Sequence, residues 1–352
     1  MDKSHVTIKG RGAADNPQGR FDKHARSHDD GEAEIQSKPD TVITLQQARS
    51  IIARNDSPDL PFTQSINPYQ GCEHGCIYCY ARPSHAYLGL SPGLDFETRI
   101  FAKENAAELL RKELSRADYR CDLIALGANT DPYQPVERKH RITRGILEVL
   151  WEFRNPVGIV TKGSLIERDL DVLEPMALEG LVQAFVSIGS LDGEIARTLE
   201  PRAAAPFRRV ETIRRLSGSG VPCGVLVAPI IPFLNDKDME AVLEAVSEAG
   251  ARMAGYTVLR LPWEVKDLFK DWLERHYPLK AKHVMARIRD MRGGRDNDPN
   301  FGSRMKGEGQ FAELLRNRFG LACKRLGLNA GERNRLDTAK FRRPGPQQGA
   351  LF

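Results

Sequence analysis

Residues 67–80 read Asn67-Pro68-Tyr69-Gln70-Gly71-Cys72-Glu73-His74-Gly75-Cys76-Ile77-Tyr78-Cys79-Tyr80 and place three thiols within eight residues. The glycines and the proline around the thiols favour a loop over a helix or a strand. Cysteine thiolates hold iron–sulfur clusters, and a loop with three of them can ligate three irons of a 4Fe-4S cube. The fourth iron then has no protein ligand. The spacing therefore predicts a cluster with one iron open to chemistry.

A structural zinc site is the main alternative for these cysteines, with His74 or His85 as the fourth ligand. No second cysteine pair and no His-x3-5-His unit follows at the distance typical of zinc fingers. Disulfides are disfavoured because Met1 to His5 are not followed by the apolar core of a secretory signal. The three remaining cysteines are expected to be buried structural residues: Cys121, Cys223 and Cys323.

The spacing of Cys72, Cys76 and Cys79, with Tyr78 before the last cysteine, resembles the signature of radical S-adenosylmethionine (radical SAM) enzymes. The resemblance implies that S-adenosyl-L-methionine binds the open iron of a 4Fe-4S cluster. One electron then cleaves the sulfonium to methionine and a 5′-deoxyadenosyl radical. The resemblance further implies that Tyr78 contacts adenine and that a cellular one-electron reductant of the flavodoxin or ferredoxin type is a partner. The predicted metal ligands are the three cysteines.

The 352-residue chain is long enough for one large α/β domain with extensions. Lys and Arg number 52 against 47 Asp and Glu, and this net charge of +5 permits an anionic partner without requiring one. No apolar run approaches the ~20 residues that span a bilayer. We therefore expect a soluble, cytoplasmic protein.

Short apolar runs alternate with amphipathic helical patterns from residue 63 onward, which is typical of a parallel sheet with crossover helices. The expected strands are 63–67, 122–126, 157–161, 182–188, 222–227 and 255–259. The expected helices between them are 106–116, 142–154, 169–179, 207–216 and 238–249. Six such units agree with the partial (β/α)6 TIM-like barrel that the resemblance implies.

Polar residues follow several of these strands, where the active residues of parallel α/β folds lie. Asn129, Thr130 and Asp131 offer oxygens to an ammonium group. Lys162 and Arg197 suit the methionine carboxylate, and Ser187 suits a ribose hydroxyl. The predicted cofactor-binding residues are thus Tyr78, Asn129, Thr130, Asp131, Lys162, Ser187 and Arg197. A turn or capping role is the alternative for each of them.

Segments 130–137, 161–169, 199–202 and 227–236 resemble the radical SAM group named for spore photoproduct lyase. That lyase reverses a thymine dimer, so the resemblance implies a nucleic-acid base as substrate, as in DNA repair. Asn129 stands where the lyase has a hydrogen-donating cysteine, so we do not expect reversal by the lyase's route. Modification of a protein or a small metabolite stays open, as does a non-catalytic metal-binding module that recruits partners.

Both ends of the chain are expected to lie outside the core, which we place at residues 45–262. Residues 1–44 have few large apolar residues and predict a mostly disordered tail, followed by a helix around 45–52. Residues 263–330 predict a helical, basic extension that offers a surface to nucleic acid or phosphate. Residues 331–352 predict a flexible basic tail. Its Gln348, Leu351 and Phe352 resemble the pentapeptide that binds the bacterial sliding clamp.

Overall fold

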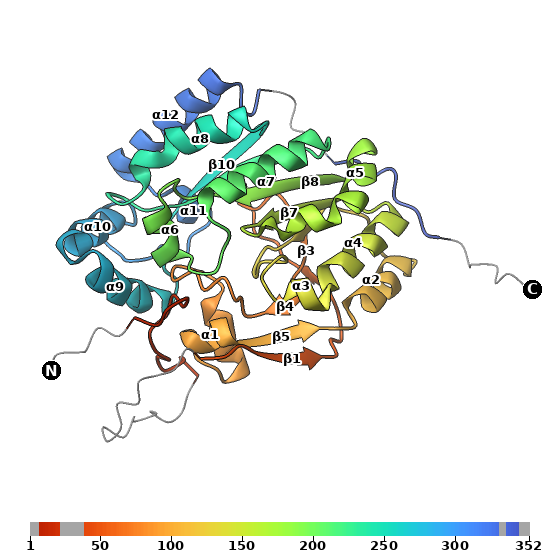
Figure 1. The fold of residues 1–352 in the computed structure, drawn as a ribbon, viewed down its shortest axis with the longest axis horizontal. Coiled ribbons are helices and arrows are strands. Elements are labelled where there is room, and N and C mark those ends of the chain that lie inside the picture. Colours follow the sequence, from red (N-terminus) through yellow and green to blue (C-terminus); the bar gives the residue numbers. More distant parts are fainter. Residues whose placement is uncertain (1–6, 22–38, 331–335, 345–352) are drawn as a thin grey trace, which may run out of the picture.

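Seven strands form the core sheet in the computed structural model of the protein, which describes residues 7–21, 39–330 and 336–344 (Figure 1). They are β2 (Ile52–Arg54), β3 (Gln64–Ile66), β6 (Ile124–Leu126), β7 (Val157–Thr161), β8 (Val182–Ser187), β9 (Cys223–Ile230) and β10 (Met253–Val258). Their spatial order is β10-β9-β8-β7-β6-β3-β2. Neighbours from β3 to β10 are parallel, and β2 is antiparallel to β3. The six parallel strands confirm the predicted α/β core.

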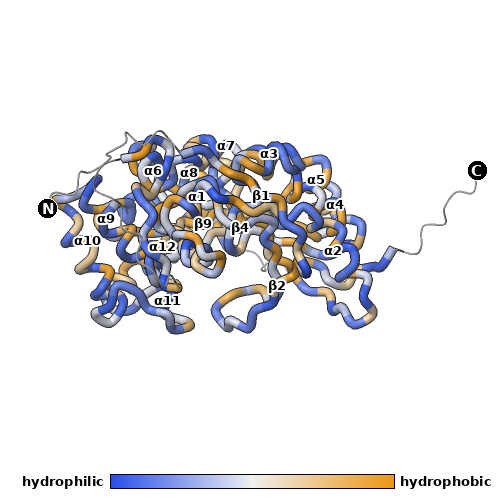
Figure 2. The backbone as a smooth tube through the Cα atoms, turned by 90° about the horizontal axis from the view of Figure 1, so that it is seen from below, coloured by the Kyte–Doolittle hydropathy of each residue, from blue (hydrophilic) through white to orange (hydrophobic). Residues whose placement is uncertain are grey.

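Amphipathic helices connect the parallel strands and cover the sheet (Figure 1). The longer ones are α2 (Ala106–Ser115), α4 (Ile142–Phe153), α5 (Leu170–Leu178), α7 (Pro206–Gly218) and α8 (Met239–Glu248). The short ones are α3 (Glu137–His140), η2 (Ser164–Asp169), α6 (Gly193–Leu199) and η3 (Asp236–Asp238). Figure 2 shows hydrophobic and hydrophilic residues alternating along these helices. In α4, Ile146, Leu147 and Leu150 are fully buried, and each contributes about 1.5–3 kcal/mol to stability.

A second, three-stranded sheet was not expected from the sequence. It consists of β1 (Val42–Gln46), β5 (Arg99–Lys103) and β4 (Tyr69–Gln70), in the order β1-β5-β4. The predicted helix around residues 45–52 is therefore wrong, because this stretch holds the end of β1 and the start of β2. Pairing of β1 with β5 outweighs the weak local preference for a helix. The 3-10 helix η1 (Arg82–Leu88) and α1 (Leu94–Thr98) connect β4 to β5.

Residues 7–21 pack against the core, and we call them the N-terminal strap. Ile8 and Ala13 are buried, and the guanidinium of Arg11 donates to Glu97 O (3.0 Å) and Pro39 O (2.7 Å). The prediction of a disordered tail is therefore wrong for these residues. Polar contacts with buried partners hold the strap, so its lack of large apolar residues did not reveal that it is ordered.

The C-terminal extension is helical, as predicted. It contains α9 (Val265–His276), α10 (Pro278–Asp290), α11 (Ser303–Lys306) and α12 (Gly309–Leu326), and α12 lies beside α8 (Figure 1). Among the described helices none is long and apolar enough to cross a membrane.

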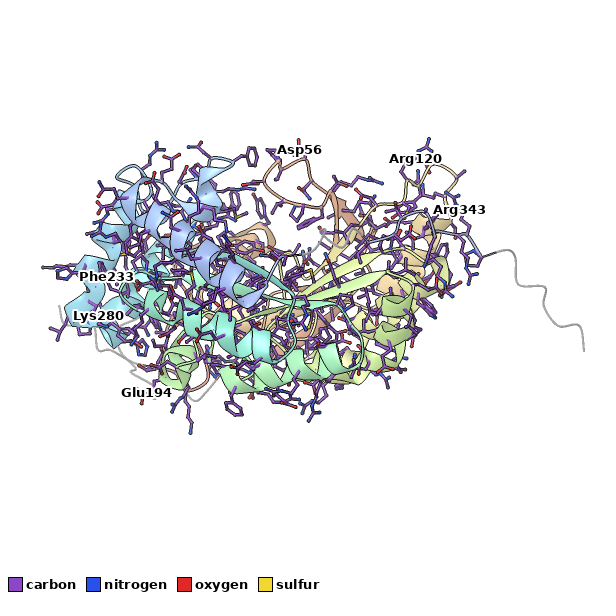
Figure 3. The ribbon with its side chains drawn as sticks, turned by 90° about the horizontal axis from the view of Figure 1, so that it is seen from above. Asp56, Arg120, Glu194, Phe233, Lys280 and Arg343 are labelled. Carbon is purple, nitrogen blue, oxygen red and sulfur yellow. The ribbon has the colours of Figure 1, made fainter. Side chains whose placement is uncertain are left out.

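Residues 336–344 return to the core, which corrects the prediction of a flexible tail for this stretch. The ring centroid of Phe341 lies 5.5 Å from that of Tyr119, and Arg342 N donates to Phe153 O (2.9 Å). Arg343 reaches the backbone of residues 116–119, at the end of the molecule where Figure 3 labels Arg120 and Arg343. The predicted clamp-binding residues Gln348, Leu351 and Phe352 lie outside the described residues.

Candidate cluster and cofactor site

The three-cysteine loop leaves β3 at the carboxyl edge of the core sheet, where a catalytic loop was expected. Cys72 and Cys76 are buried, Cys79 is partly buried, and all three thiols are free. Cys72 N donates to Phe96 O (2.9 Å), and Cys79 N donates to Cys76 O (3.2 Å). Gly71 has a φ of +81°, and a Cβ there would meet the Ile100 side chain at 2.9 Å. The loop therefore has one compact path, which glycine permits.

Two amide side chains fix this loop to the loop that follows β6. Asn67 Oδ1 accepts hydrogen bonds from Asn129 N (2.8 Å) and Thr130 N (3.3 Å). The fully buried Gln134 accepts a hydrogen bond from Glu73 N (2.8 Å) and donates one to Gly71 O (3.1 Å). These contacts position the thiols without using them.

The segment 199–202 holds the opposite side of the cysteine loop. Ile77 N donates to Leu199 O (3.1 Å), and Arg202 N donates to His74 O (3.2 Å). The Arg202 guanidinium also pairs with Glu73, with 2.9 Å between Nη2 and Oε1. This part of the sequence pattern thus supports the loop backbone.

The surroundings of the thiols disfavour free thiolates. Burial is the largest cause that raises the pKa of Cys76, to about 12, and nearby Glu200 and Cys79 raise it further while Lys162 opposes them. Thiolates in such surroundings need a bound cation to neutralise them. Within the described part of the chain, no group of three His, Cys, Asp or Glu side chains is arranged to hold a single metal ion.

Neither histidine proposed as a zinc ligand is directed to that role. His74 Nδ1 lies 3.2 Å from Asp131 Oδ2, and His85 Nε2 lies 3.0 Å from Arg99 O. Three free thiols in one loop, with no fourth ligand from His74 or His85, are the donor set expected for a 4Fe-4S cluster with one open iron.

A buried ionic group lies beside the cysteine loop. The hydroxyl of Tyr78 donates to Glu200, which also pairs with Arg209. Arg209 Nη1 donates to Ser187 O (2.8 Å), and Lys162 Nζ lies 5.8 Å from the centroid of the Tyr78 ring. The ends of β7 and β8, the residue after α6 and the first turns of α7 therefore converge on the cysteine loop here.

Lys162 is a stable cation in this group. Burial alone would lower its pKa, but the negative charges of Cys76, Glu200 and Asp131 outweigh burial and raise it. The pKa of Glu200 is lowered for the converse reason, because Arg209 and Lys162 together outweigh its burial. A charged ammonium beside the cluster loop can bind a carboxylate.

Asp131 makes several contacts within the fold. Its carboxylate accepts hydrogen bonds from Thr161 Oγ1 (2.7 Å), Lys162 N (2.7 Å) and Tyr133 N (2.9 Å). Its pKa is lowered because His74 and these donors outweigh burial. Thr130 is likewise engaged, since its hydroxyl donates to Tyr69 O (2.7 Å). Both residues therefore tie strand ends together, and Asp131 has few lone pairs left for a ligand's ammonium group.

The predicted cofactor residues divide into two sets. Tyr78, Lys162 and Ser187 meet around Glu200 and Arg209, which sequence reasoning missed as site residues. Asn129 lies at the carboxyl end of β6, with its N–H bound to the cysteine loop. Arg197 is exposed on α6 and apart from this set. The signal for Glu200 was its place in the segment 199–202, directly before Pro201 and Arg202.

A cavity of about 600 Å³ lies elsewhere, between β2 and α2. Its lining residues include none of the predicted site residues; they are Arg49, Ser50, Ile52, Arg54, Leu109, Lys112, Glu113, Arg116, Asp118 and Tyr119. The cluster site is therefore recognised by its donor set and not by a large hollow.

Known proteins resemble this chain in sequence and in fold. The family model of the Radical SAM superfamily matches residues 66–246. An uncharacterized protein of Mycobacterium tuberculosis is 37% identical over 256 residues, covering 71% of this chain and 74% of the relative. An uncharacterized protein of Methanocaldococcus jannaschii is 25% identical over 213 residues, covering 60% and 76%.

Solved structures of spore photoproduct lyase share the fold. A cysteine-to-serine mutant superposes with a TM-score of 0.59 at 17% identity, covering 81% of this chain and 80% of the lyase. The family model spans more than half of the chain, and the alignment with the mycobacterial relative covers more than two thirds of the chain. The chain therefore belongs to the radical SAM superfamily, whose members use a 4Fe-4S cluster and S-adenosyl-L-methionine.

Proposed function

We propose that this protein cleaves S-adenosyl-L-methionine reductively and directs the resulting radical at a nucleic-acid base. The observation that carries the proposal is the set of three free thiols at the carboxyl edge of the sheet, beside the partly buried cation Lys162. The cluster, when bound, would supply the electron that breaks the carbon–sulfur bond of the cofactor. Cys72, Cys76 and Cys79 would be its ligands.

The neighbouring residues bind and orient in this proposal. Lys162 pairs with the methionine carboxylate. Glu200 and Arg209 hold the hydroxyl end of Tyr78, so that its ring keeps one position against adenine. Cys72 and Cys76 are each only 7% exposed, which limits the access of water to the reacting atoms.

A base as substrate is the finer part of the proposal. One structural neighbour is a lyase solved with bound AdoMet and dinucleoside spore photoproduct, at a TM-score of 0.58 and 16% identity. Asn129 cannot donate a hydrogen atom as a thiol does, so the reaction ends differently from the lyase's. A protein or a small metabolite is the alternative substrate.

Anaerobic reconstitution tests the proposal directly. Protein loaded with iron and sulfide and reduced with dithionite should form 5′-deoxyadenosine from S-adenosyl-L-methionine. A Cys121→Ala protein, altered at a thiol outside the loop, serves as the matched control. Zinc in place of iron, or no 5′-deoxyadenosine from protein that holds its cluster, would refute the proposal. When deuterated nucleic acid is the substrate, deuterium should appear in the 5′-deoxyadenosine that is formed.

Two partners complete the proposal. A flavodoxin or ferredoxin supplies the electron, since radical SAM enzymes need an external reductant. The sliding clamp binds the C-terminal tail through Gln348, Leu351 and Phe352. A labelled peptide of the tail should bind the purified clamp, and the peptide with both Leu351→Ala and Phe352→Ala should not. Equal binding of the two peptides would remove this partner.

A further inference from the structure

Three arginines lie near one another where β10 meets the C-terminal extension, and their bonding differs. Arg292 is buried and donates to backbone carbonyls on both sides, among them Leu259 O (2.9 Å) and Arg304 O (2.8 Å). Arg304 forms a two-point ion pair with Asp59, at 2.6 and 2.7 Å. Arg304 is therefore paired with a carboxylate, and Arg292 has backbone acceptors for both Nη atoms, although its buried Nε has no hydrogen-bond partner.

Arg260, two residues beyond the end of β10, is not satisfied in this way. Its Nη1 lies 3.7 Å from the thioether sulfur of Met305, and its buried Nε has no hydrogen-bond partner. No ion pair with Arg260 occurs among residues 7–21, 39–330 and 336–344. Burial, followed by the neighbouring charge of Arg304, lowers its pKa. A partly desolvated cation without an anionic partner costs stability unless a ligand completes its contacts.

Arg260 faces the cysteine loop through Tyr80. Its guanidinium carbon lies 5.4 Å from the centroid of the Tyr80 ring, and Tyr80 directly follows Cys79. The Tyr80 hydroxyl donates to Ala128 O, in the loop after β6. The ring is thus fixed at its far end while 47% of the residue stays exposed. A half-exposed aromatic ring held at its hydroxyl end and a cation without an ion pair therefore lie next to the cluster loop.

A second aromatic and cationic pair lies nearby in the same extension. The Arg304 guanidinium carbon is 4.5 Å from the centroid of the Phe301 ring, and Phe301 is 55% exposed. Aromatic faces with cations between them are the usual means of holding single-stranded nucleic acid, since every base stacks and every phosphate is an anion. A carboxylate ligand would pair with the cations but would gain nothing from stacking on the exposed rings.

We propose that Arg260 binds a backbone phosphate of the substrate and that the adjoining base stacks on the ring of Tyr80. This subsite rests on the proposed function and deepens it, because it states which residues hold the substrate beside the cluster. Arg260 and Tyr80 act here in substrate binding and specificity and take no part in breaking bonds.

Fluorescence anisotropy with a short labelled oligothymidylate tests the subsite in reconstituted protein under anaerobic conditions. Arg260→Gln should weaken binding about tenfold or more, since a charge-assisted hydrogen bond is lost. The slope of log affinity against log salt should fall in magnitude by about 0.7, the value for one phosphate contact on a single strand. Arg260→Lys should restore most of the slope, because the charge remains.

Arg111→Gln is the matched control, because it removes the same charge from an exposed arginine on α2 that pairs with Glu152. It should leave both affinity and slope unchanged. An oligothymidylate with neutral methylphosphonate linkages should bind the wild type weakly and lose nothing further in Arg260→Gln. Iron content and circular dichroism of each variant show whether the fold is intact.

Equal affinity and equal slope for wild type and Arg260→Gln would overturn the subsite. Displacement of the oligonucleotide by a polyglutamate peptide at equal charge would also overturn it, because the site would then be a carboxylate site. The proposed function fails separately, if wild-type protein with its cluster forms no 5′-deoxyadenosine, whatever the binding result.

Discussion

Replacing Gly12 by alanine tests how the N-terminal strap is seated on the cysteine loop. A Cβ at Gly12 would lie 1.9 Å from Gly75 O, far inside contact distance, and Gly75 lies between Cys72 and Cys76. Gly75 O is a backbone atom, and the position of a Cβ is fixed by the backbone of residue 12, so no side-chain rotation can relieve the clash. The strap must therefore lift from the loop in the Gly12→Ala protein.

The size of the effect follows from the bonds that lifting breaks. Gly12 N and Ala13 N donate to the buried carboxylate of Glu97 at 3.0 and 2.9 Å. Hydrogen bonds to a charged group contribute about 1.5–3 kcal/mol each. Losing both at the lower end amounts to about 3 kcal/mol, which is roughly a hundredfold in the fraction of molecules with an open strap.

Limited trypsin digestion measures this fraction at Arg11, which is 5% exposed in the seated strap. Cleavage after Arg11 should be roughly a hundredfold faster in Gly12→Ala, provided that closing of the strap outpaces cleavage. Release of iron to a chelator should also accelerate. Gly320→Ala is the matched control, because an added Cβ there meets no heavy atom within 4 Å. If both variants are cut after Arg11 at the same rate, the contact with Gly75 does not hold the strap.

Three further predictions concern the core of the site and its surroundings. Alanine at any one of the three loop cysteines should abolish stable cluster binding, seen as loss of iron and of visible absorbance, while Cys223→Ala should retain both. Glu200→Gln should cost about 3–5 kcal/mol in denaturant unfolding, because it leaves the Arg209 cation buried without its partner. Burial, with a smaller effect of Arg316, lowers the pKa of Lys306 from 10.5 to about 8. Between about pH 8 and 10.5 this lysine is still protonated in the unfolded chain but has lost its proton in the folded protein. The free energy of unfolding of the wild type should therefore rise with pH over this range, relative to that of Lys306→Met. A constant difference across that range would contradict the lowered pKa.

Strands β6, β7, β8 and β9 were predictable because each reads as a mainly apolar run and most of its residues are buried. Strand β7 shows this best, since its observed bounds, Val157–Thr161, equal the predicted ones. The three-cysteine loop could be recognised because its pattern depends on local spacing alone. Features of this kind are set by residues close together in the sequence and do not depend on distant contacts.

Features that depend on distant partners were not predictable. β1 forms by pairing with β5, more than fifty residues away, and the strap is held by Glu97, which no local pattern marks as its acceptor. Glu200 and Arg209 become site residues only when the segment 199–202 folds against Tyr78. The sequence pattern places such residues at the carboxyl edge of the sheet but does not show which of them contact one another.

The core sheet ends in two edge strands, β2 and β10, and the ion pair of Asp59 with Arg304 links their surroundings. Figure 3 labels Asp56 on the loop that carries Asp59. A single side-chain pair joins two edges by fewer bonds than a ladder of backbone hydrogen bonds, and both side chains of this pair are mostly buried. The surroundings of the two edge strands are thus linked on this side by a side-chain contact and not by pairing of β2 with β10.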